Sequence, residues 1–318
     1  MFNKPKISII IPVFNCENLV SFTLNSLLKQ TFVDWECILI DDNSTDNVFL
    51  VLQEYQKKDD RFKVFRKPLE LKQGANVSRN FGFLKAKGSY IKWFDCDDIM
   101  LPAHLEMVYE ALLKNNLDFV VTDTFNFNDE NGELICKPYN FDREQGIISA
   151  ENLALNRIGW VTDDFIGKRE LLEKINFNEN ITSIGDEYNF FVRFLHHTVN
   201  GALINEVLTH RRLHNNSIIY NNGEHTKNYA FKVAIVKFQT AKDLMVYNDV
   251  ELIRWFLSGY MQYAFKLAIE NEKIPFWIPA FKLICTYYSF RKGCAFIIAL
   301  SSARSFGKGY NIMKYARK

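Results

Sequence analysis

The sequence predicts an α/β fold: a mostly parallel sheet with helices on both faces, followed by an all-helical C-terminal extension. Over the first 130 residues, short apolar runs alternate with helical patterns, which is typical of a parallel sheet covered on both faces. From about residue 224 onward, every pattern is helical. The 318 residues, 48% hydrophobic and 24% charged, exclude a disordered chain and suffice for about two structural units.

The first half alternates strand and helix in a regular order. Apolar runs predict strands over 7–13, 37–40, 62–65, 90–94 and 119–121. Helical spacing predicts helices over 17–29, 46–57, 75–86 and 103–115. Gly88 is expected to end the third helix and Pro102 to begin the fourth.

The second half is less regular at first and then becomes helical. Residues 131–185 show weak periodicity. A helix is predicted over 186–196, a strand over 202–209 and a polar basic loop over 210–217. Helices over 229–245 and 251–269 follow. We therefore predict one domain over 1–218 and a helical extension over 224–318.

The cysteine pattern and the short apolar runs indicate which cellular compartment the protein occupies. The six cysteines form no Cys-x-x-Cys pair and no zinc spacing, as is typical of a reducing cytoplasm. The apolar run near the start is too short for a signal peptide, and no run approaches the length of a membrane span. We expect a cytoplasmic protein.

Basic charge is concentrated in the last part of the chain. Residues 273–318 hold nine Lys or Arg and no Asp or Glu, although the net charge of the whole chain is only +2. This overall charge does not indicate a nucleic-acid partner. Two interpretations of the basic, aromatic tail stay open: a packed helical subdomain with a basic outer face, or a segment lying peripherally on an anionic membrane.

Acidic residues follow the ends of two predicted strands. The segments are Asp41-Asp42-Asn43-Ser44 and Asp95-Cys96-Asp97-Asp98. Ligands of open parallel sheets bind beyond the carboxyl ends of the strands. One such residue alone is more often a turn or cap residue, but two acidic clusters favour a divalent cation, Mg²⁺ or Mn²⁺, with a diphosphate. The absence of G-x-G-x-x-G and of G-x-x-x-x-G-K-[ST] argues against a dinucleotide site and a P-loop.

Four motifs together resemble the inverting glycosyltransferases of family 2, which have the GT-A nucleotide-sugar fold. They are Ser-Ile-Ile-Ile-Pro-Val-Phe-Asn at 8–15, Leu-Ile-Asp-Asp-Asn-Ser-Thr-Asp at 39–46, Ser-Arg-Asn-Phe-Gly at 78–82 with Ala-Lys-Gly-Ser-Tyr at 86–90, and Phe-Asp-Cys-Asp-Asp at 94–98. The resemblance covers about residues 6–218. It implies metal-dependent transfer of a sugar, from a nucleotide-sugar such as a UDP-sugar, to a hydroxyl of a cell-surface glycan or a lipid-linked saccharide. Residues 131–185, with Trp160, Asp163 and Asp164, are expected on the acceptor side.

The resemblance also assigns the donor site. Its nucleotide-binding positions are Pro12, Phe14, Asn15, Asp41, Asp42, Arg79 and Asp95. Phe14 stands where the family often has Tyr, so it keeps the stacking face and lacks a hydroxyl. The metal is expected on Asp97, with Asp95 and His214. Residues 212–217 resemble the family's R-x-H-x-x-S loop, which implies diphosphate contacts for Arg212 and His214.

The general base is expected in a later motif. Residues 185–193 resemble G-E-D-x-x-F-x-x-R with the two acids exchanged, so Glu187 occupies the family's base position and Asp186 is the alternative. One base without an enzyme nucleophile implies a single displacement with inversion. A two-carboxylate glycosidase would not need a nucleotide site. The exchanged acids keep a second interpretation open, namely a catalytically silent nucleotide-sugar-binding subunit of a glycan assembly complex.

Overall fold

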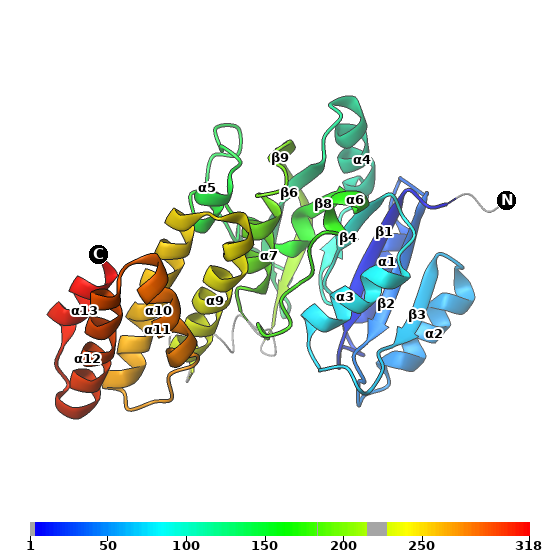
Figure 1. The fold of residues 1–318 in the computed structure, drawn as a ribbon. Coiled ribbons are helices and arrows are strands. Elements are labelled where there is room, and N and C mark those ends of the chain that lie inside the picture. Colours follow the sequence, from blue (N-terminus) through cyan, green and yellow to red (C-terminus); the bar gives the residue numbers. More distant parts are fainter. Residues whose placement is uncertain (1–3, 183, 215–227) are drawn as a thin grey trace. The chain divides into compact units, whose positions relative to one another are not determined.

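The computed structural model describes residues 4–182, 184–214 and 228–318, arranged in two compact units (Figure 1). The first unit comprises Met1–Glu179 and Phe190–Asn215. The second comprises Asn180–Asn189 and Asn216–Lys318. Each unit is described by itself below.

The first unit is built on a mixed sheet that, in the described part of the chain, has nine strands in the order β3-β2-β1-β4-β8-β6-β9-β5, with β7 beside β6. The strands are β1 Ile7–Val13, β2 Trp35–Asp41, β3 Phe62–Arg66, β4 Tyr90–Trp93, β5 Ile99–Met100, β6 Phe119–Asn128, β7 Leu134–Cys136, β8 Phe165–Lys168 and β9 Gly201–Leu213. β3, β2, β1 and β4 run parallel, as predicted. β8 is antiparallel to both β4 and β6, and β6 is parallel to β9. β5 and β7 pair antiparallel with β9 and β6.

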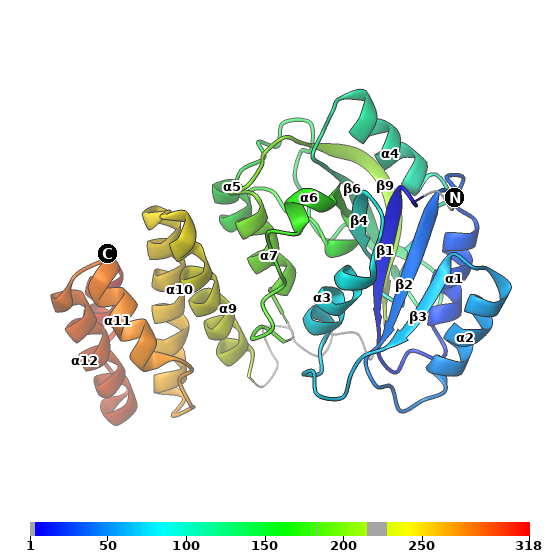
Figure 2. The same cartoon turned by 45° about the vertical axis from the view of Figure 1, so that its right-hand side comes forward.

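Helices cover both faces of this sheet, which confirms the predicted fold class. The helices are α1 Val20–Leu28, α2 Val48–Lys58, α3 Ala75–Lys85, α4 His104–Lys114, α5 Ala150–Ala154, α6 Arg169–Leu172 and α7 Asp186–Phe194. Apolar residues of α1, α2 and α4 share one core with alternate residues of β1. On the opposite face, Gly82 of α3 lies against Ile10 and Ile40, where an added Cβ would be 2.5 Å from Ile10. Figure 2 shows α3 on one side of β1 and β2, and α1 and α2 on the other.

Three sequence predictions are corrected in the first unit. The predicted loop over 210–217 is wrong for its first four residues, because β9 continues to Leu213 and pairs with β6. Residues 215–217 of that loop lie outside the described residues. Gly88 does not cap α3, which ends at Lys85; it lies where an added Cβ would be 2.5 Å from the Ser8 nitrogen. The weakly periodic region contains β7, α5, β8 and α6, with the 3₁₀ turn η1 at Thr162–Asp164.

The second unit is helical after residue 228. It consists of α9 Tyr229–Asp243, η2 Leu244–Tyr247, α10 Val250–Ile269, α11 Trp277–Tyr287, α12 Phe290–Phe306 and α13 Tyr310–Arg317. The caps at Asp249 and Ser289 accept hydrogen bonds from the nitrogens of Leu252 and Lys292. α10 packs against α9, α11, α12 and α13, around a core that includes Tyr260 and Phe296. Among the described helices, none combines the length and the apolar character required to cross a membrane.

Candidate active site

The carboxylates at the end of β2 are buried and matched by cations. Asp41 accepts hydrogen bonds from Arg66 Nε at 2.9 Å and from the Ser44 nitrogen at 3.1 Å. Asp42 forms an ion pair with Lys67 and accepts a hydrogen bond of 2.7 Å from the Gly74 nitrogen. Lys67 is 1% exposed, so this pair is held away from water. The two carboxylates therefore fix the loops that follow β2 and β3.

The end of β1 presents an aromatic face beside this cluster. Pro12 is half-buried, and Phe14 directly after the strand is 46% exposed. Asn15 adopts a left-handed backbone with φ 47°, which asparagine tolerates better than most residues. Its side-chain oxygen accepts a hydrogen bond of 2.8 Å from the Thr45 nitrogen, so the β1 and β2 loops are tied together. Phe14 thus has an accessible ring on a fixed loop.

Arg79 of α3 reaches the loop that follows β4. Arg79 is 5% exposed and donates a hydrogen bond of 2.9 Å to Asp95. Its guanidinium carbon lies 5.2 Å from the centre of the Phe177 ring. The Asp95 side chain is 37% exposed, so one carboxylate oxygen is oriented by arginine while the group stays accessible.

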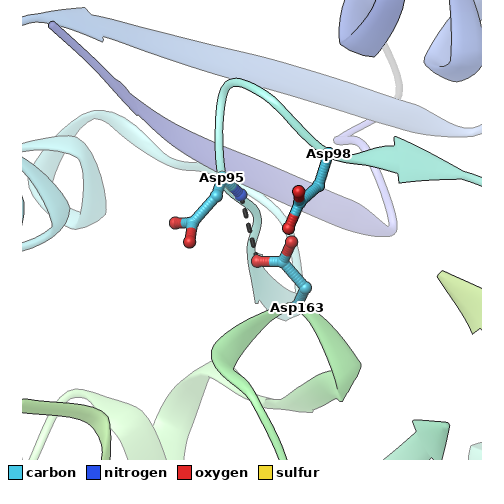
Figure 3. A group of neighbouring side chains, drawn as sticks. All are labelled: Asp95, Asp98 and Asp163. Carbon is cyan, nitrogen blue, oxygen red and sulfur yellow. Dashed lines mark hydrogen bonds between the residues drawn. The ribbon is translucent and has the colours of Figure 1, made fainter. Parts of the chain in front are cut away.

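Asp163 joins this loop from a distant part of the sequence. It lies in the 3₁₀ turn η1 before β8, and its carboxylate accepts a hydrogen bond of 3.0 Å from the Asp95 nitrogen (Figure 3). Figure 3 also shows the carboxyl groups of Asp98 and Asp163 facing each other. Carboxylate oxygens of Asp95, Asp98 and Asp163 lie within 4.8 Å of one another. Oxygen ligands so placed match the preference of Mg²⁺ and Mn²⁺.

Burial and mutual repulsion raise the pKa values of Asp98 and Asp163. Burial, together with the charge of Asp97, raises the pKa of Asp98 to about 8. Burial also raises the pKa of Asp163 well above its usual range, and the charges of Asp95 and Asp98 add to the effect. Asp98 also accepts a hydrogen bond of 2.8 Å from the Arg212 nitrogen. A bound cation would supply positive charge that offsets the repulsion between these carboxylates.

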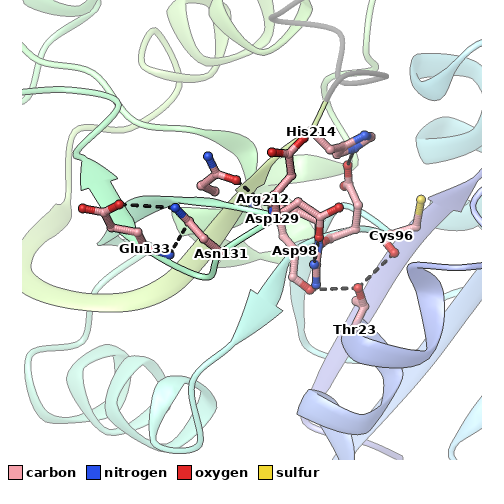
Figure 4. A network of polar contacts seen from close by, with 11 residues as sticks. Thr23, Cys96, Asp98, Asp129, Asn131, Glu133, Arg212 and His214 are labelled. Carbon is pink, nitrogen blue, oxygen red and sulfur yellow. Dashed lines mark hydrogen bonds and ion pairs between the residues drawn. The ribbon is translucent and has the colours of Figure 1, made fainter.

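Asp97 and His214 form the accessible part of the same cluster. His214 Nε2 lies 3.0 Å from the Asp97 carboxylate, and the two side chains are 16% and 26% exposed. This contact raises the pKa of His214 above its usual value, despite the opposing effect of burial. Arg212 donates a hydrogen bond of 2.8 Å from Nε to the Asp97 carbonyl and forms an ion pair with Asp129 (Figure 4). Strand β9 thus delivers both basic residues to the loop after β4.

A second layer of buried groups lies behind the acidic loop. Lys92 of β4 donates a hydrogen bond to the Asp163 carbonyl, and burial lowers the pKa of Lys92 to about 8. Burial raises the pKa of Asp164 to about 7, and its carboxylate accepts a hydrogen bond of 2.6 Å from Thr124 Oγ1. Asp123 pairs with Arg143 at 2.8 Å and with Lys137 at 2.6 Å. These contacts hold the segment around η1 against β4 and β6.

The structure brings most of the predicted donor-site residues to one edge of the sheet. Arg79, Asp95, Asp97, Arg212 and His214 converge on the loop after β4. Asp186 and Glu187 begin α7 and belong to the second unit. The acceptor-side candidates Trp160 and Asp164 are 2% and 1% exposed, so neither side chain presents a binding surface.

Three contributors were not predicted as members of the donor site. Lys67 neutralises Asp42, Asp129 pairs with Arg212, and Asp163 completes the acidic group. Asp163 was assigned to the acceptor side because it lies in a region without clear periodicity. In the sequence, only the Asp-Asp pair at 163–164 points to Asp163, and an acidic pair alone is a weak indication of a metal or donor site.

Comparison with known proteins agrees with this arrangement. Residues 8–175 match the family model described as glycosyl transferase family 2. The UDP-Glc:alpha-D-GlcNAc-diphosphoundecaprenol beta-1,3-glucosyltransferase WfgD of Escherichia coli is 38% identical over 114 residues, which make up 36% of this chain and 44% of that protein. The GalNAc(5)-diNAcBac-PP-undecaprenol beta-1,3-glucosyltransferase of Campylobacter jejuni is 39% identical over 106 residues, 33% of this chain and 34% of that protein. The chain thus matches less than half the length of each of these curated relatives.

A solved structure is similar over nearly the whole chain. TarS 1-349 of S. aureus, determined in complex with UDP-GlcNAc, has a TM-score of 0.67 and 18% sequence identity. The similarity covers 98% of this chain and 90% of that one. At this identity the likeness establishes the fold alone.

Proposed function

Since the chain belongs to glycosyl transferase family 2, we propose that it transfers a sugar from a nucleotide-sugar to an acceptor hydroxyl, with inversion at the anomeric carbon. In this reaction the acceptor oxygen forms a bond to the anomeric carbon while the bond to the diphosphate oxygen breaks. The observation that carries the proposal is the loop after β4. There, accessible carboxylates lie beside Arg79, Arg212 and His214, a mixture suited to an anionic diphosphate and its cation.

The proposed donor is a UDP-sugar. The E. coli relative is named for UDP-Glc, and the TarS 1-349 structure contains UDP-GlcNAc. The exposed Phe14 ring offers a stacking surface for a base, beside Pro12. Asp42 would accept a hydrogen bond from the base, using lone pairs that Lys67 and Gly74 leave available. Asn15 and Asp41 would hold the loops of this pocket.

The proposed cofactor is Mg²⁺ or Mn²⁺. Asp97, Asp95 and His214 would hold the ion, and the grouping with Asp98 and Asp163 adds oxygen ligands. This donor set, oxygen-rich with one imidazole, suits either ion. When bound, the ion supplies positive charge that stabilises the departing diphosphate.

Arg212 and His214 would stabilise the leaving group directly. His214 would act in one of two ways: as a neutral ligand of the ion, or as a protonated donor to a phosphate oxygen, and its contact with Asp97 favours the second. Arg212 is held between its bonds to the Asp97 carbonyl and Asp129. Its position is therefore fixed before the donor binds.

The proposed general base is Glu187, with Asp186 as the alternative. A carboxylate in this role accepts the proton of the acceptor hydroxyl as the new bond forms. Both residues lie in the first turn of α7. The resemblance of residues 185–193 to the family motif supports Glu187, because it occupies the base position of that motif.

The proposed acceptor is a lipid-linked saccharide or a growing cell-surface glycan. Both curated relatives carry a diphosphoundecaprenol or PP-undecaprenol acceptor in their names. An acceptor of this kind resides in a membrane, so we place the enzyme peripherally on the cytoplasmic face of the inner membrane. The basic segment 273–318 would provide the contact.

Release of the nucleotide from a panel of nucleotide-sugars in the presence of Mn²⁺ tests this function. We expect turnover with at least one UDP-sugar, and Glu187→Gln to reduce its rate by roughly 10²–10⁴. Asp186→Asn is the matched control and should have a much smaller effect. A larger loss in Asp186→Asn would assign the base to Asp186. Donor binding without turnover would instead identify a catalytically silent nucleotide-sugar-binding subunit.

A further inference from the structure

The turn that begins α11 exposes adjacent large apolar side chains. Trp277 and Ile278 are 47% and 52% exposed, and Pro279 after them is also exposed. By contrast, Trp35, Trp93 and Trp160 are each 2% exposed. Phe290 and Phe306 are more exposed still, at 69% and 75%, so the exposed Trp-Ile pair assigns a partner only together with the backbone and the charge around it.

The backbone holds this pair outward through a strained residue. Phe276, the N-cap of α11, has a φ of 55°, which is rare for a bulky side chain. Two contacts fix the turn: the Phe276 ring stacks on Phe238 at 4.9 Å, and Tyr260 donates a hydrogen bond of 2.7 Å to the Pro275 carbonyl. The conformation is therefore built into the second unit, and strain of this kind often marks a functional position.

Basic residues flank the turn, and the acidic Glu270 and Glu272 precede it. Lys282 lies four residues after Ile278 on α11, and both side chains are exposed, so they share one face of the helix. Lys273 precedes the turn and is also exposed. Of the nine Lys and Arg in 273–318, none forms an ion pair with a carboxylate among the residues that the structure describes. Even Arg304 and Arg317 donate to neutral oxygens, at 2.7 Å and 2.8 Å.

We propose that residues 276–279 form a membrane-inserting turn, with Trp277 and Ile278 entering the interfacial region of an anionic bilayer. Tryptophan favours this region, where its ring is amphipathic enough to sit among the headgroups. The unpaired positive charge of residues 273–318 would attract the anionic headgroups around the turn. The inference rests on the proposed function in one respect: a lipid-linked acceptor would be met at such a surface.

Co-sedimentation of the full chain with vesicles tests the proposal. With phosphatidylcholine vesicles containing phosphatidylglycerol, we expect binding that weakens as salt is raised. Trp277→Ser combined with Ile278→Ser should lower the apparent affinity about tenfold or more. The matched control, Val33→Ser with Leu84→Ser, removes side chains that are 68% and 76% exposed in the first unit, and should bind as the wild type does. Equal binding of the wild type and the Trp277/Ile278 variant would overturn the proposal.

Tryptophan fluorescence provides an independent measurement. Insertion should shift the emission to shorter wavelength and protect it from acrylamide. Trp277→Phe should abolish this shift while vesicle binding stays close to wild type. A shift that persists in Trp277→Phe would contradict the proposed depth of insertion. Self-association of the chain without vesicles that the double serine variant abolishes would show that the turn is a protein interface, which also overturns the proposal.

The vesicle experiments can fail without the proposed function failing, and the reverse is also true. Trp277 and Ile278 lie outside the assigned donor-site residues, so the double variant should retain wild-type nucleotide release from a soluble UDP-sugar. Vesicle binding as expected without any turnover would refute the proposed function alone. Turnover without anionic vesicle binding would refute the membrane turn alone.

Discussion

The ends of β2 and β4 are both acidic, yet they are neutralised in different ways. At β2, Asp41 and Asp42 are matched by Arg66 and Lys67, and both are buried. At β4, Asp95, Asp98 and Asp163 cluster, and burial together with neighbouring carboxylates raises the pKa values of Asp98 and Asp163. A neutralised carboxylate can orient a loop or accept a hydrogen bond, whereas an acidic excess provides a place for a cation. The same residue type therefore serves structure at one strand end and chemistry at the next.

The strongest test of this difference compares Asp97 with Asp41. Asp97→Ala should reduce sugar transfer about 10³-fold, or about 4 kcal/mol in activation free energy, because it removes a ligand and the partner of His214. Since Asp97 is 26% exposed, the variant should remain folded. Asp41→Asn should lower stability and weaken donor binding through the pocket loops, with a much smaller loss of turnover at saturating donor than Asp97→Ala. Steady-state kinetics and circular dichroism measure both effects, and equal losses of turnover would remove the distinction.

The free energy of unfolding should fall much more in a variant of Asp42 than in a variant of Asp95. Asp42→Asn leaves the buried Lys67 without its carboxylate, and we expect the free energy of unfolding in urea to fall by about 3 kcal/mol. Asp95→Asn breaks a pair whose carboxylate is 37% exposed, so the loss should stay below about 1 kcal/mol. Losses of equal size would show that the β4 loop is as rigidly paired as the β2 loop.

Divalent cations should act on the β4 end alone. Saturation with Mn²⁺ at about 100 times its dissociation constant should stabilise the folded chain by about 2.7 kcal/mol, and EDTA should reverse this. Thermal unfolding measures the effect. Asp97→Ala should lose most of the stabilisation, while Asp42→Asn should retain it. Undiminished sugar transfer in EDTA would show that Arg212 and His214 neutralise the diphosphate without a metal.

The last test is the pH dependence of the metal-free chain. Asp98 and Asp164 have pKa values raised to about 8 and about 7, above the value near 3.9 expected for an unfolded chain. The folded state therefore binds these protons more tightly, and their contribution to stability is present at low pH and lost as pH rises toward 8. Urea unfolding at pH 5.5 and 8 should show lower stability at pH 8 from these groups. Asp164→Asn should flatten part of that slope.

The sequence predicted the fold well where periodicity was strong. β1 has the predicted bounds, 7–13, and α1, α2, α3 and α4 lie within or one residue beyond their predicted ranges. The motif residues 12–15, 41–46 and 95–98 lie at strand ends, because parallel strands place their carboxyl ends at one edge. Local pattern was sufficient for this part of the site.

Periodicity did not predict the elements that are short or that depend on partners far away in the sequence. β8 has only four residues, and it depends on antiparallel pairing with β4 and β6 rather than on its own pattern. Lys67 and Asp129 have partners at Asp42 and Arg212 that only the folded chain brings near. The predicted donor-site roles, the domain bounds and the base assignment remain predictions for the experiments above.

Strand β8 also closes two open edges inside the sheet, although the other edge of β6 stays open until β9 is made. β8 lies between β4 and β6, so until it is added both strands have an open edge with unpaired N–H and C=O groups. Chains emerge from the ribosome N-terminus first, so β4 and β6 are made well before β8. Asp163, in the turn η1 just before β8, reaches the β4 loop in the same step that closes these two edges. A nascent chain therefore covers the edges of β4 and β6 that face β8 in the same step that brings Asp163 to its cluster. Truncation before residue 165 removes β8, so we expect it to lose both the edge protection and the fixed position of Asp163.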